Sequence, residues 1–233
     1  GENTKVEIPS MPGIFRRTLD LTVEEVKELY ALGIRAVNIY VKVSDDLKDN
    51  TGKEAWNDNG LMQRAIRAIK AACPEMIVMP DVALDPYSIY GHDGIIEKGD
   101  VANDATNDAL VKMAVSHAKA GADFVAPSDM MDGRVLRLRQ GLDAAGFHNV
   151  GIMSYSAKYA SAFYGPFRDA LDSAPKDADV EVPKDKKTYQ MDYANRIEAV
   201  KEALWDVEEG ADMVMVKPGI AYLDIVREVK NAV

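Results

Sequence analysis

The apolar and polar positions along the chain repeat as one unit: an amphipathic helical stretch, a break and a short apolar run. In the first unit, an apolar stripe from Val23 to Tyr30 is followed by Gly33 and by the apolar run 34–41. Thr22 and Glu25 have the T-x-x-E spacing of a capping box, which predicts that this helix begins at Thr22. Gly33 is expected to end the helix, because glycine is favoured directly after a helix C-terminus.

Four more units follow the same order. The later helices are predicted over 61–72, 109–120, 134–145 and 197–209, and the later strands over 76–84, 122–127, 149–158 and 211–219. The apolar runs do not alternate strictly with polar residues, which indicates strands buried on both faces and hence a parallel sheet. We therefore expect one α/β domain over residues 1–233.

Side chains that can carry chemistry come directly after several of these apolar runs. They are Asp81, Ser128, Asp129, Lys158 and Lys217. Functional groups after different strands favour a (β/α)8 TIM barrel, because its active site gathers the carboxyl ends of the strands. An open doubly wound sheet is the alternative, but it would often carry a glycine-rich phosphate turn, which this sequence lacks. The barrel is the preferred interpretation, with about five of its β/α units in this chain.

Composition limits the partners that the protein is expected to have. The formal net charge of -10 argues against nucleic acid or an anionic membrane, because either would call for an excess of lysine and arginine. Charged residues interrupt every apolar run before the length of about 18 residues that a transmembrane helix requires. The single cysteine, Cys73, cannot form an intrachain disulfide, which fits a reducing compartment. A soluble protein is expected.

Two lysines at predicted strand ends are the strongest candidates for catalysis. Lys217 ends the apolar strand 212–216, and Lys158 has the same position in the strand before it. A lysine in a dry barrel interior has a lowered pKa, which an amine nucleophile needs to form a Schiff base. Two lysines in one pocket would each lower the pKa of the other. The ordinary alternative for each is a solvated lysine at the end of a strand.

Longer motifs around these lysines resemble the porphobilinogen synthase (5-aminolevulinate dehydratase) family. The segments that carry the resemblance are, in chain order, 81–95, 128–134, 154–171, 186–191 and 210–230. The resemblance implies that two molecules of 5-aminolevulinate condense, with loss of two waters, to the pyrrole porphobilinogen. It also implies that Lys217 holds one substrate as a Schiff base, on the side that becomes the acetate and aminomethyl groups. Lys158 would hold the other, whose carboxylate becomes the propionate.

The resemblance further assigns the binding of a substrate carboxylate. Arg168 and Lys186 would bind it, because both offer cationic donors, and Gln190 would add a neutral donor. Lys186 lies in a charge-rich stretch, where a merely solvated lysine is the alternative. The segment 159–191 is expected to be an active-site lid, since so long a connection in a compact domain is usually a lid or disordered.

Four more residues are expected in the substrate pocket. Tyr155 and Phe167 would pack against bound substrate, although each is also an ordinary core aromatic. Ser128 and Asp129 would hydrogen-bond the substrate or orient the lysines.

The loop that begins at Asp81 departs from the zinc-dependent members of the family. Those members carry three cysteines there, whereas this chain has Ala83, Asp85 and Asp93. Alanine offers no ligand and carboxylates are hard donors, so no catalytic zinc is expected. The three aspartates are expected to act as acid/base groups or to hold a hard cation such as Mg²⁺, unless they merely cap turns. His92, beside them, is a candidate proton shuttle or a structural histidine.

Three further expectations come from the resemblance alone. Members without the cysteines often bind an allosteric Mg²⁺ through a glutamate at the position of Glu202, which here lies among other helical glutamates that are ordinarily exposed. Family members usually assemble as octamers, so a homo-oligomer is expected. The aspartate-type loop and the segment 44–59 resemble plastid and bacterial members, which predicts a plastid or a bacterial cytoplasm.

The family's barrel has strands that this chain lacks, so the intact protein is expected to be longer at both ends. Two other interpretations stay open. A Schiff-base aldolase on the same type of barrel would need only one nucleophilic lysine. A truncated fragment or decayed paralogue without catalysis is the second, and the presence of both Lys158 and Lys217 argues against decay.

Overall fold

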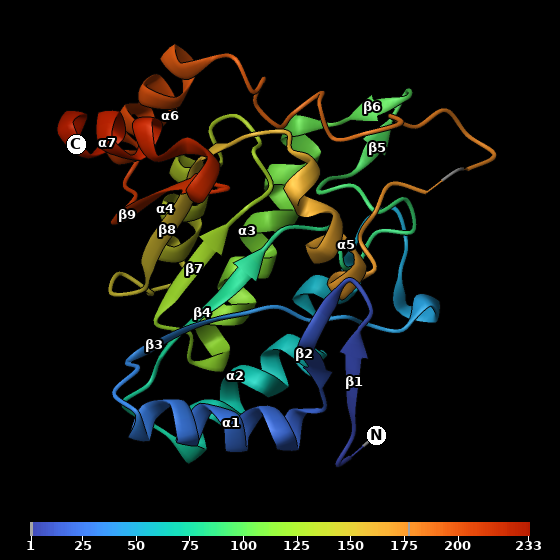
Figure 1. Ribbon diagram of the computed structural model, residues 1–233, viewed down its shortest axis with the longest axis vertical. Helices are drawn as coiled ribbons and strands as arrows, with labels where there is room; N and C mark the ends of the chain where they lie inside the picture. The colour runs from blue at the N-terminus through green and yellow to red at the C-terminus, as the bar shows by residue number, and fades with distance from the viewer. Residues whose placement is uncertain (1, 177) are drawn as a thin grey trace.

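The computed structural model describes residues 2–176 and 178–233, and its centre is a curved sheet of five parallel strands (Figure 1). The spatial order of the strands is β3-β4-β7-β8-β9. Their bounds are β3 (Ala36–Ile39), β4 (Ile77–Val82), β7 (Phe124–Pro127), β8 (Gly151–Lys158) and β9 (Met213–Lys217). Strands that follow one another in sequence are neighbours in space, as in a β/α barrel. The five predicted β/α units and their parallel sheet are thereby confirmed.

Helices connect the strands and cover the sheet. Their bounds are α1 (Leu19–Ala31), α2 (Leu61–Ala72), α3 (Asn103–Ala120), α4 (Arg134–Ala144), α5 (Gly165–Leu171), α6 (Arg196–Glu208) and α7 (Leu223–Ala232). Within the described ranges, no helix is long and apolar enough to cross a membrane.

The sequence pattern placed most helix ends within one residue, but two helices begin earlier than predicted. The prediction that the helix begins at Thr22 is wrong, because α1 begins at Leu19 and the extended backbone already ends at Thr18. Thr22 therefore lies inside the helix, where its hydroxyl donates to the Thr18 carbonyl at 3.1 Å. In α3, the first turns from Asn103 are polar, so the apolar pattern did not show that the helix begins there.

Several short elements were not predicted. An antiparallel hairpin lies near the N-terminus, and a smaller one projects between β4 and α3. The strands are β1 (Lys5–Ile8), β2 (Met11–Arg17), β5 (Ile96–Glu97) and β6 (Asp100–Val101), and the 3₁₀ turns are η1 (Asp45–Leu47), η2 (Lys53–Trp56), η3 (Ala162–Tyr164) and η4 (Ile220–Tyr222).

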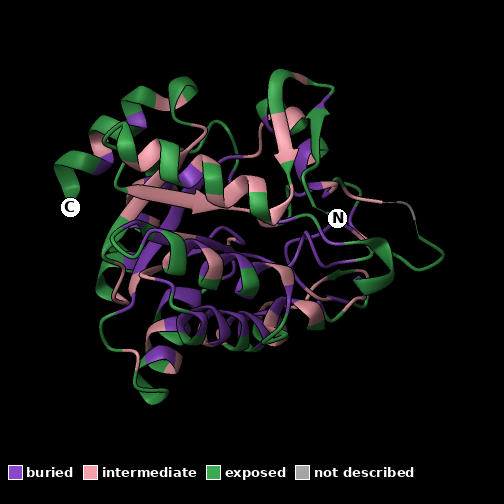
Figure 2. Ribbon diagram, turned by 90° about the horizontal axis from the view of Figure 1, so that it is seen from below, coloured by how far each residue is buried: buried purple, intermediate pink, exposed green. Residues whose placement is uncertain are grey.

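Both faces of the sheet are covered by apolar side chains. The main core lies between the sheet and the first four helices, and a second cluster lies beneath α6 and α7. A small third cluster, built on Ala126, Met153 and Tyr155, occupies the concave face. Figure 2 shows burial concentrated in the middle of the molecule, whereas β3 and β9, at the two edges of the sheet, are only half-buried.

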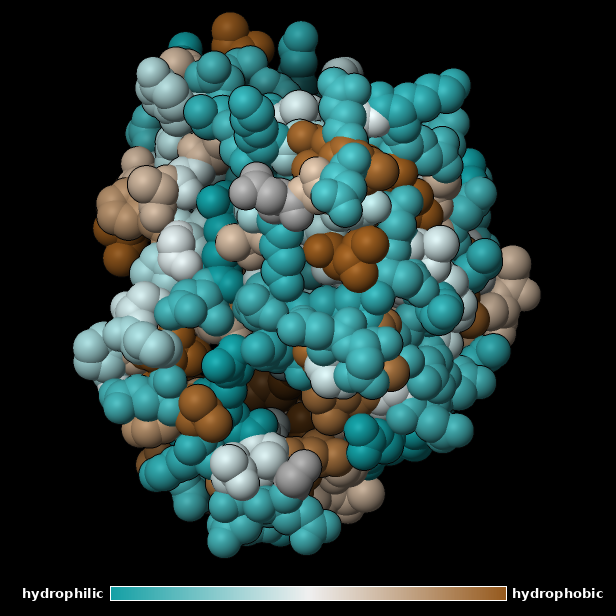
Figure 3. Space-filling model, turned by 90° about the vertical axis from the view of Figure 1, so that its right-hand side faces the viewer, coloured by the Kyte–Doolittle hydropathy of each residue, from teal (hydrophilic) through white to brown (hydrophobic). Residues whose placement is uncertain are grey.

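An apolar cavity of about 740 Å³ lies beside the edge strand β3, between the N-terminal hairpin, α1 and α5. Figure 3 shows a hollow with hydrophobic residues at its floor on the side of the molecule that carries the hairpin. The chemistry-bearing side chains lie elsewhere, where β4, β7, β8 and β9 end.

Candidate active site

Two neighbouring parallel strands bring the two predicted lysines together. Lys158 is the last residue of β8 and Lys217 the last residue of β9, and they are partners in the register of these strands. The carboxyl ends of parallel strands meet at one edge of the sheet, which is where β/α barrels carry their active sites. The structure therefore places the lysines side by side, and their catalytic roles stay a prediction.

An irregularity in β8 lets Tyr155 and Lys158 share one pocket. Side chains alternate along a regular strand, so residues three apart would point to opposite faces. The register between β8 and β9 shifts beyond Ser154, which breaks this alternation. As a result, the Tyr155 ring centre lies 5.0 Å from the Lys217 Nζ atom, while Lys158 also reaches the pocket from the same strand.

Three aromatic rings surround the amine of Lys217. Its Nζ atom lies 5.0 Å from the ring centre of Tyr155, 5.5 Å from that of Tyr164 and 4.4 Å from that of Phe167. Burial, and next the charge of Lys158, lower the pKa of Lys217 to about 8. About one tenth of this amine is therefore uncharged at pH 7, far more than for a solvated lysine.

Lys158 lies in an ion-pair cluster that the sequence did not reveal. Its Nζ atom is 3.2 Å from Asp93 Oδ2 and also donates to the Ser128 carbonyl. The other oxygen of Asp93 lies 2.5 Å from the Nζ atom of Lys186, which reaches Asp85 Oδ2 at 3.4 Å. All four charged side chains are buried, so each charge depends on its partner.

The pKa values of the cluster follow from this pairing. Burial opposes ionisation of Asp93, but the charges of Lys158 and Lys186 hold its pKa below the usual range. Burial likewise opposes the charge of Lys186, and the charges of Asp85 and Asp93 nevertheless raise its pKa. The cluster is thus two ammonium groups around one ionised carboxylate, with Asp85 at its edge.

Asp81 has a different environment. It is buried in β4, and its Oδ1 atom accepts a hydrogen bond from the Ser128 hydroxyl at 2.6 Å. Burial and the charge of Asp85 raise the pKa of Asp81 to about 7. A carboxyl group with this pKa can both take up and release a proton near neutral pH.

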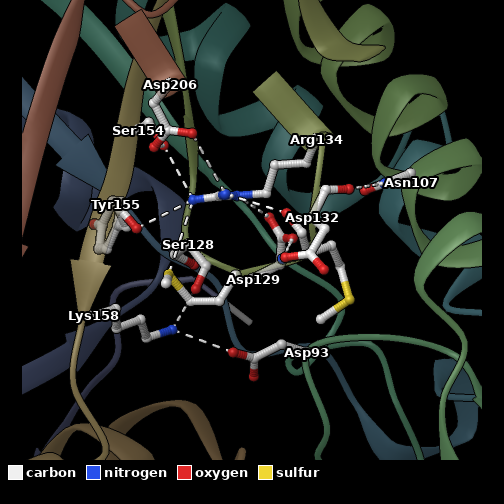
Figure 4. Close-up of polar contacts among 12 residues, drawn as sticks. Asp93, Asn107, Ser128, Asp129, Asp132, Arg134, Ser154, Tyr155, Lys158 and Asp206 are labelled. Carbon is white, nitrogen blue, oxygen red and sulfur yellow. Dashed lines mark hydrogen bonds and ion pairs between the residues drawn. The ribbon is translucent and has the colours of Figure 1, made fainter. Parts of the chain in front are cut away.

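Asp129 belongs to a buried network around Arg134, which is the first residue of α4 (Figure 4). The Arg134 Nε atom lies 3.4 Å from Asp129 Oδ2, and Nη2 donates to the Ser154 hydroxyl and the Tyr155 carbonyl, both at 3.1 Å. Ser154 in turn donates to Asp206 at 2.7 Å. Burial, against the opposing charge of Arg134, raises the pKa of Asp129 to about 6. Asp129 therefore supports the strand that ends in Lys158.

The segment 159–191, which is predicted to be a lid, supplies four of the predicted side chains, and the structure describes 159–176 and 178–191 of it. Phe167 and Arg168 lie on α5, and Phe167 packs edge-to-face on Tyr40, with ring centres 5.0 Å apart. Within the described part of the chain, Arg168 forms no ion pair, while the buried Gln190 leaves its Oε1 atom without a hydrogen-bond partner. The Arg168 guanidinium is thus available to an anionic ligand, whereas Gln190 could bind one only through its Nε2 group, because Oε1 is an acceptor.

The three histidines differ in their surroundings. His92 is fully buried and both ring nitrogens are engaged, by Pro183 and by Tyr189, which fits a structural role better than a shuttle. His117 is buried in α3, and burial lowers its pKa to about 3. His148 is exposed beside Asp143.

Sequence reasoning missed Tyr40, Tyr164, Tyr189 and Arg134. Tyr164 and Tyr189 had a weak signal, since they lie in the motifs 154–171 and 186–191, and Arg134 ends the motif 128–134. Tyr40 lies in the predicted strand 34–41 and had no signal of its own.

The loop residues do not fit a catalytic zinc. Ala83 provides no donor, and Asp85 and Asp93 already face the ammonium group of Lys186. Within the described ranges, no three His, Cys, Asp or Glu side chains gather in the way a metal site requires. Cys73 is buried at the end of α2, away from this loop.

Glu202 lies on α6, outside the lysine pocket. Burial and the neighbouring charge of Asp206 raise its pKa to about 7. The charge of Arg134 opposes this rise in pKa, and the charges of Asp132 and Glu198 add smaller contributions to it.

A curved parallel β/α sheet with two lysines at adjacent strand ends defines a β/α-barrel protein with the groups of a Schiff-base enzyme. Comparison with known proteins gives the family. The family model described as delta-aminolevulinic acid dehydratase matches residues 1–233. The chain belongs to the delta-aminolevulinic acid dehydratase family.

Individual relatives agree with this assignment. The delta-aminolevulinic acid dehydratase of Halalkalibacterium halodurans is 51% identical over 231 residues, which are 99% of this chain and 68% of the relative. The chloroplastic protein of Chlamydomonas reinhardtii is 55% identical over 229 residues, 97% of this chain and 59% of its own length. The crystal structure of the Toxoplasma gondii dehydratase with porphobilinogen has a TM-score of 0.95 and 49% identity, covering 100% of this chain and 65% of that one. The chain thus spans about two thirds or less of these relatives.

Proposed function

We propose that the intact protein is a porphobilinogen synthase, a lyase that condenses two molecules of 5-aminolevulinate to porphobilinogen in tetrapyrrole biosynthesis. The observation that carries the proposal is the adjacent pair Lys158 and Lys217, one with a lowered pKa and one in an ion-pair cluster. The relative from Toxoplasma gondii was crystallised with the reaction product porphobilinogen, which supports the same reaction here. An aldolase would have no use for the second buried lysine.

Lys217 starts the chemistry, because its lowered pKa leaves part of its amine uncharged at neutral pH. Its nitrogen attacks the ketone carbon of one substrate, and loss of one water gives a Schiff base. Lys158 binds the second substrate in the same way after one of its protons leaves. Both amines return when the pyrrole ring closes and aromatises, so the net loss is two waters.

The surrounding groups then bind charge and move protons. Arg168, Lys186 and Gln190 bind one substrate carboxylate, for which Lys186 would exchange part of its contact with Asp93 and Asp85. Asp81, with its pKa of about 7, is the candidate for proton transfer at the carbons that are joined.

Trapping with borohydride tests the proposal on the intact protein. Incubation with 5-aminolevulinate should yield porphobilinogen, and reduction should leave a covalent adduct on Lys217, detected by peptide mass spectrometry. Because its pKa is about 8, the rate of adduct formation should rise with pH to half its maximum near pH 8. Absence of both product and adduct would refute the function, whereas an adduct on one lysine without product would favour an aldolase.

We further propose that catalysis needs no zinc and that a hydrated Mg²⁺ near Glu202 acts only as an allosteric activator. A zinc-selective chelator should therefore leave the rate unchanged, while removal of Mg²⁺ should lower it. The variant Glu202→Gln should lose the Mg²⁺ response and its direct Mg²⁺ binding by calorimetry, and should keep the rate measured without Mg²⁺. Inactivation by the zinc-selective chelator with recovery on adding zinc would contradict the first part.

The family also suggests an oligomeric state and a cellular location for the intact protein. We propose a homo-oligomer, an octamer in the intact protein, located in a plastid or a bacterial cytoplasm. Chloroplastic and bacterial proteins among the relatives support the location.

A further inference from the structure

The lid is fastened to the aspartate loop by a short chain of hydrogen bonds that the proposed chemistry does not use. The Tyr189 hydroxyl, from the end of the lid segment, lies 3.0 Å from His92 Nδ1 and 3.3 Å from the backbone nitrogen of Asp93. The other ring nitrogen of His92 lies 2.8 Å from the carbonyl oxygen of Pro183, also in the lid. His92 and Asp93 are fully buried.

The donors and acceptors of this hydrogen-bond chain fit only one arrangement. The carbonyl of Pro183 can only accept, so His92 Nε2 carries the proton and donates to it. In the neutral ring, Nδ1 is then an acceptor, and the Tyr189 hydroxyl donates to it. The same hydroxyl oxygen accepts the backbone N–H of Asp93.

The ionisation states agree with this arrangement. Burial lowers the pKa of His92, and the charge of nearby Lys186 adds to this effect. The hydrogen bond with the Pro183 carbonyl and the charges of Asp93 and Asp100 oppose it. The ring is therefore mostly neutral at pH 7. Burial and the charge of Asp93 raise the pKa of Tyr189, so its hydroxyl keeps the proton that it donates.

Asp93 connects this hydrogen-bond chain to the amine of Lys158. Its backbone N–H is held by Tyr189, and its carboxylate lies between Lys158 and Lys186. Tyr189 and Lys186 come from the same stretch of the lid, so a closed lid fixes Asp93 twice, at the backbone and at the carboxylate. An open lid would release both contacts together and leave Asp93 free to turn away from Lys158.

We propose that His92 and Tyr189 are positioning residues that couple closure of the lid to the placement of the Asp93 carboxylate against Lys158. This role rests on the proposed function only in so far as Lys158 reacts. Both residues would act through Asp93.

The variant Tyr189→Phe tests the coupling, because it removes one hydroxyl and keeps the ring that packs beside His92. We expect kcat/KM for 5-aminolevulinate to fall about 10- to 100-fold, mostly in kcat, since the amine is misplaced rather than removed. The backbone amide of Asp93 and the lid amides of 184–190 should exchange with deuterium faster, while those of α2 keep their wild-type rates. The matched control is Tyr193→Phe, because Tyr193 is 75% exposed, and it should change neither quantity.

His92 provides a second, independent variant. His92→Leu should lower kcat/KM as Tyr189→Phe does, and the double variant should be no worse than either single one, because all three break the same chain. His92→Gln keeps one donor and one acceptor and should restore part of the loss. Wild-type kinetics together with wild-type exchange at Asp93 in Tyr189→Phe would overturn the proposal. Faster exchange throughout the molecule, with losses of kcat/KM that add up in the double variant, would also overturn it. Exchange is measured without substrate, so it decides the coupling even if the wild-type protein forms no porphobilinogen and the proposed function fails.

Discussion

Replacing Lys217 with alanine is expected to abolish porphobilinogen formation in the intact protein. The amine that forms the first Schiff base is then absent, and loss of a covalent nucleophile typically lowers kcat on the order of 10⁴-fold or more. The fold should survive, because Lys217 forms no ion pair within the described ranges and its side chain is only half-buried, so its removal leaves no charged partner unpaired. Product formation and borohydride labelling at position 217 are the two measurements.

The control for this prediction is Lys201→Ala. Lys201 is an exposed residue of α6, so its removal should leave both the rate and the adduct on Lys217 unchanged. An active Lys217→Ala variant, within tenfold of the wild-type rate, would remove Lys217 from the mechanism. An inactive variant that also fails to fold by circular dichroism calls for Lys217→Met, whose side chain has nearly the same volume.

Much of the fold was predictable because its signals are local. The apolar stripe of α2 and the polar residues that flank it predicted both ends of the helix, 61–72. A polar residue directly after an apolar run also predicted that Lys158 and Lys217 end their strands. The N-terminal hairpin was missed, since β1 and β2 pair only with each other and their positions are mostly exposed, which leaves no apolar pattern to detect.

The internal arrangement of the site was not predictable in the same way, because its contacts join distant parts of the chain. Asp93 and Lys186 are 93 residues apart, and Arg134 meets Ser154 from a separate element. A charged residue at the start of a helix has the pattern of an exposed position, so only the fold shows that Arg134 is 3% exposed. The family motifs supply part of the missing information, because they mark site residues whose contacts the apolar pattern cannot predict.

The Asp93→Asn substitution is expected to have the largest effect on stability. It keeps the shape of the side chain but leaves the buried ammonium groups of Lys158 and Lys186 without an anion between them. Removing one partner from a buried ion pair typically costs about 3–5 kcal/mol, because the remaining charge stays out of water. The free energy of unfolding in urea at pH 7 should fall by this amount. Asp58→Asn should leave it unchanged, because the Asp58 carboxyl is exposed and forms no ion pair in the part of the chain that the structure describes.

The pH dependence separates this electrostatic effect from a packing defect. The charges of Lys158 and Lys186 hold the pKa of Asp93 below 3.8 in the folded state, despite burial. Its contribution to stability is therefore complete above pH 3.8 and is lost as the pH falls through the lowered folded pKa. The difference in unfolding free energy between wild type and Asp93→Asn should shrink over that acidic range. A difference that stays constant with pH would assign the loss to packing, and an undiminished stability at pH 7 would show that the cluster does not need its central carboxylate.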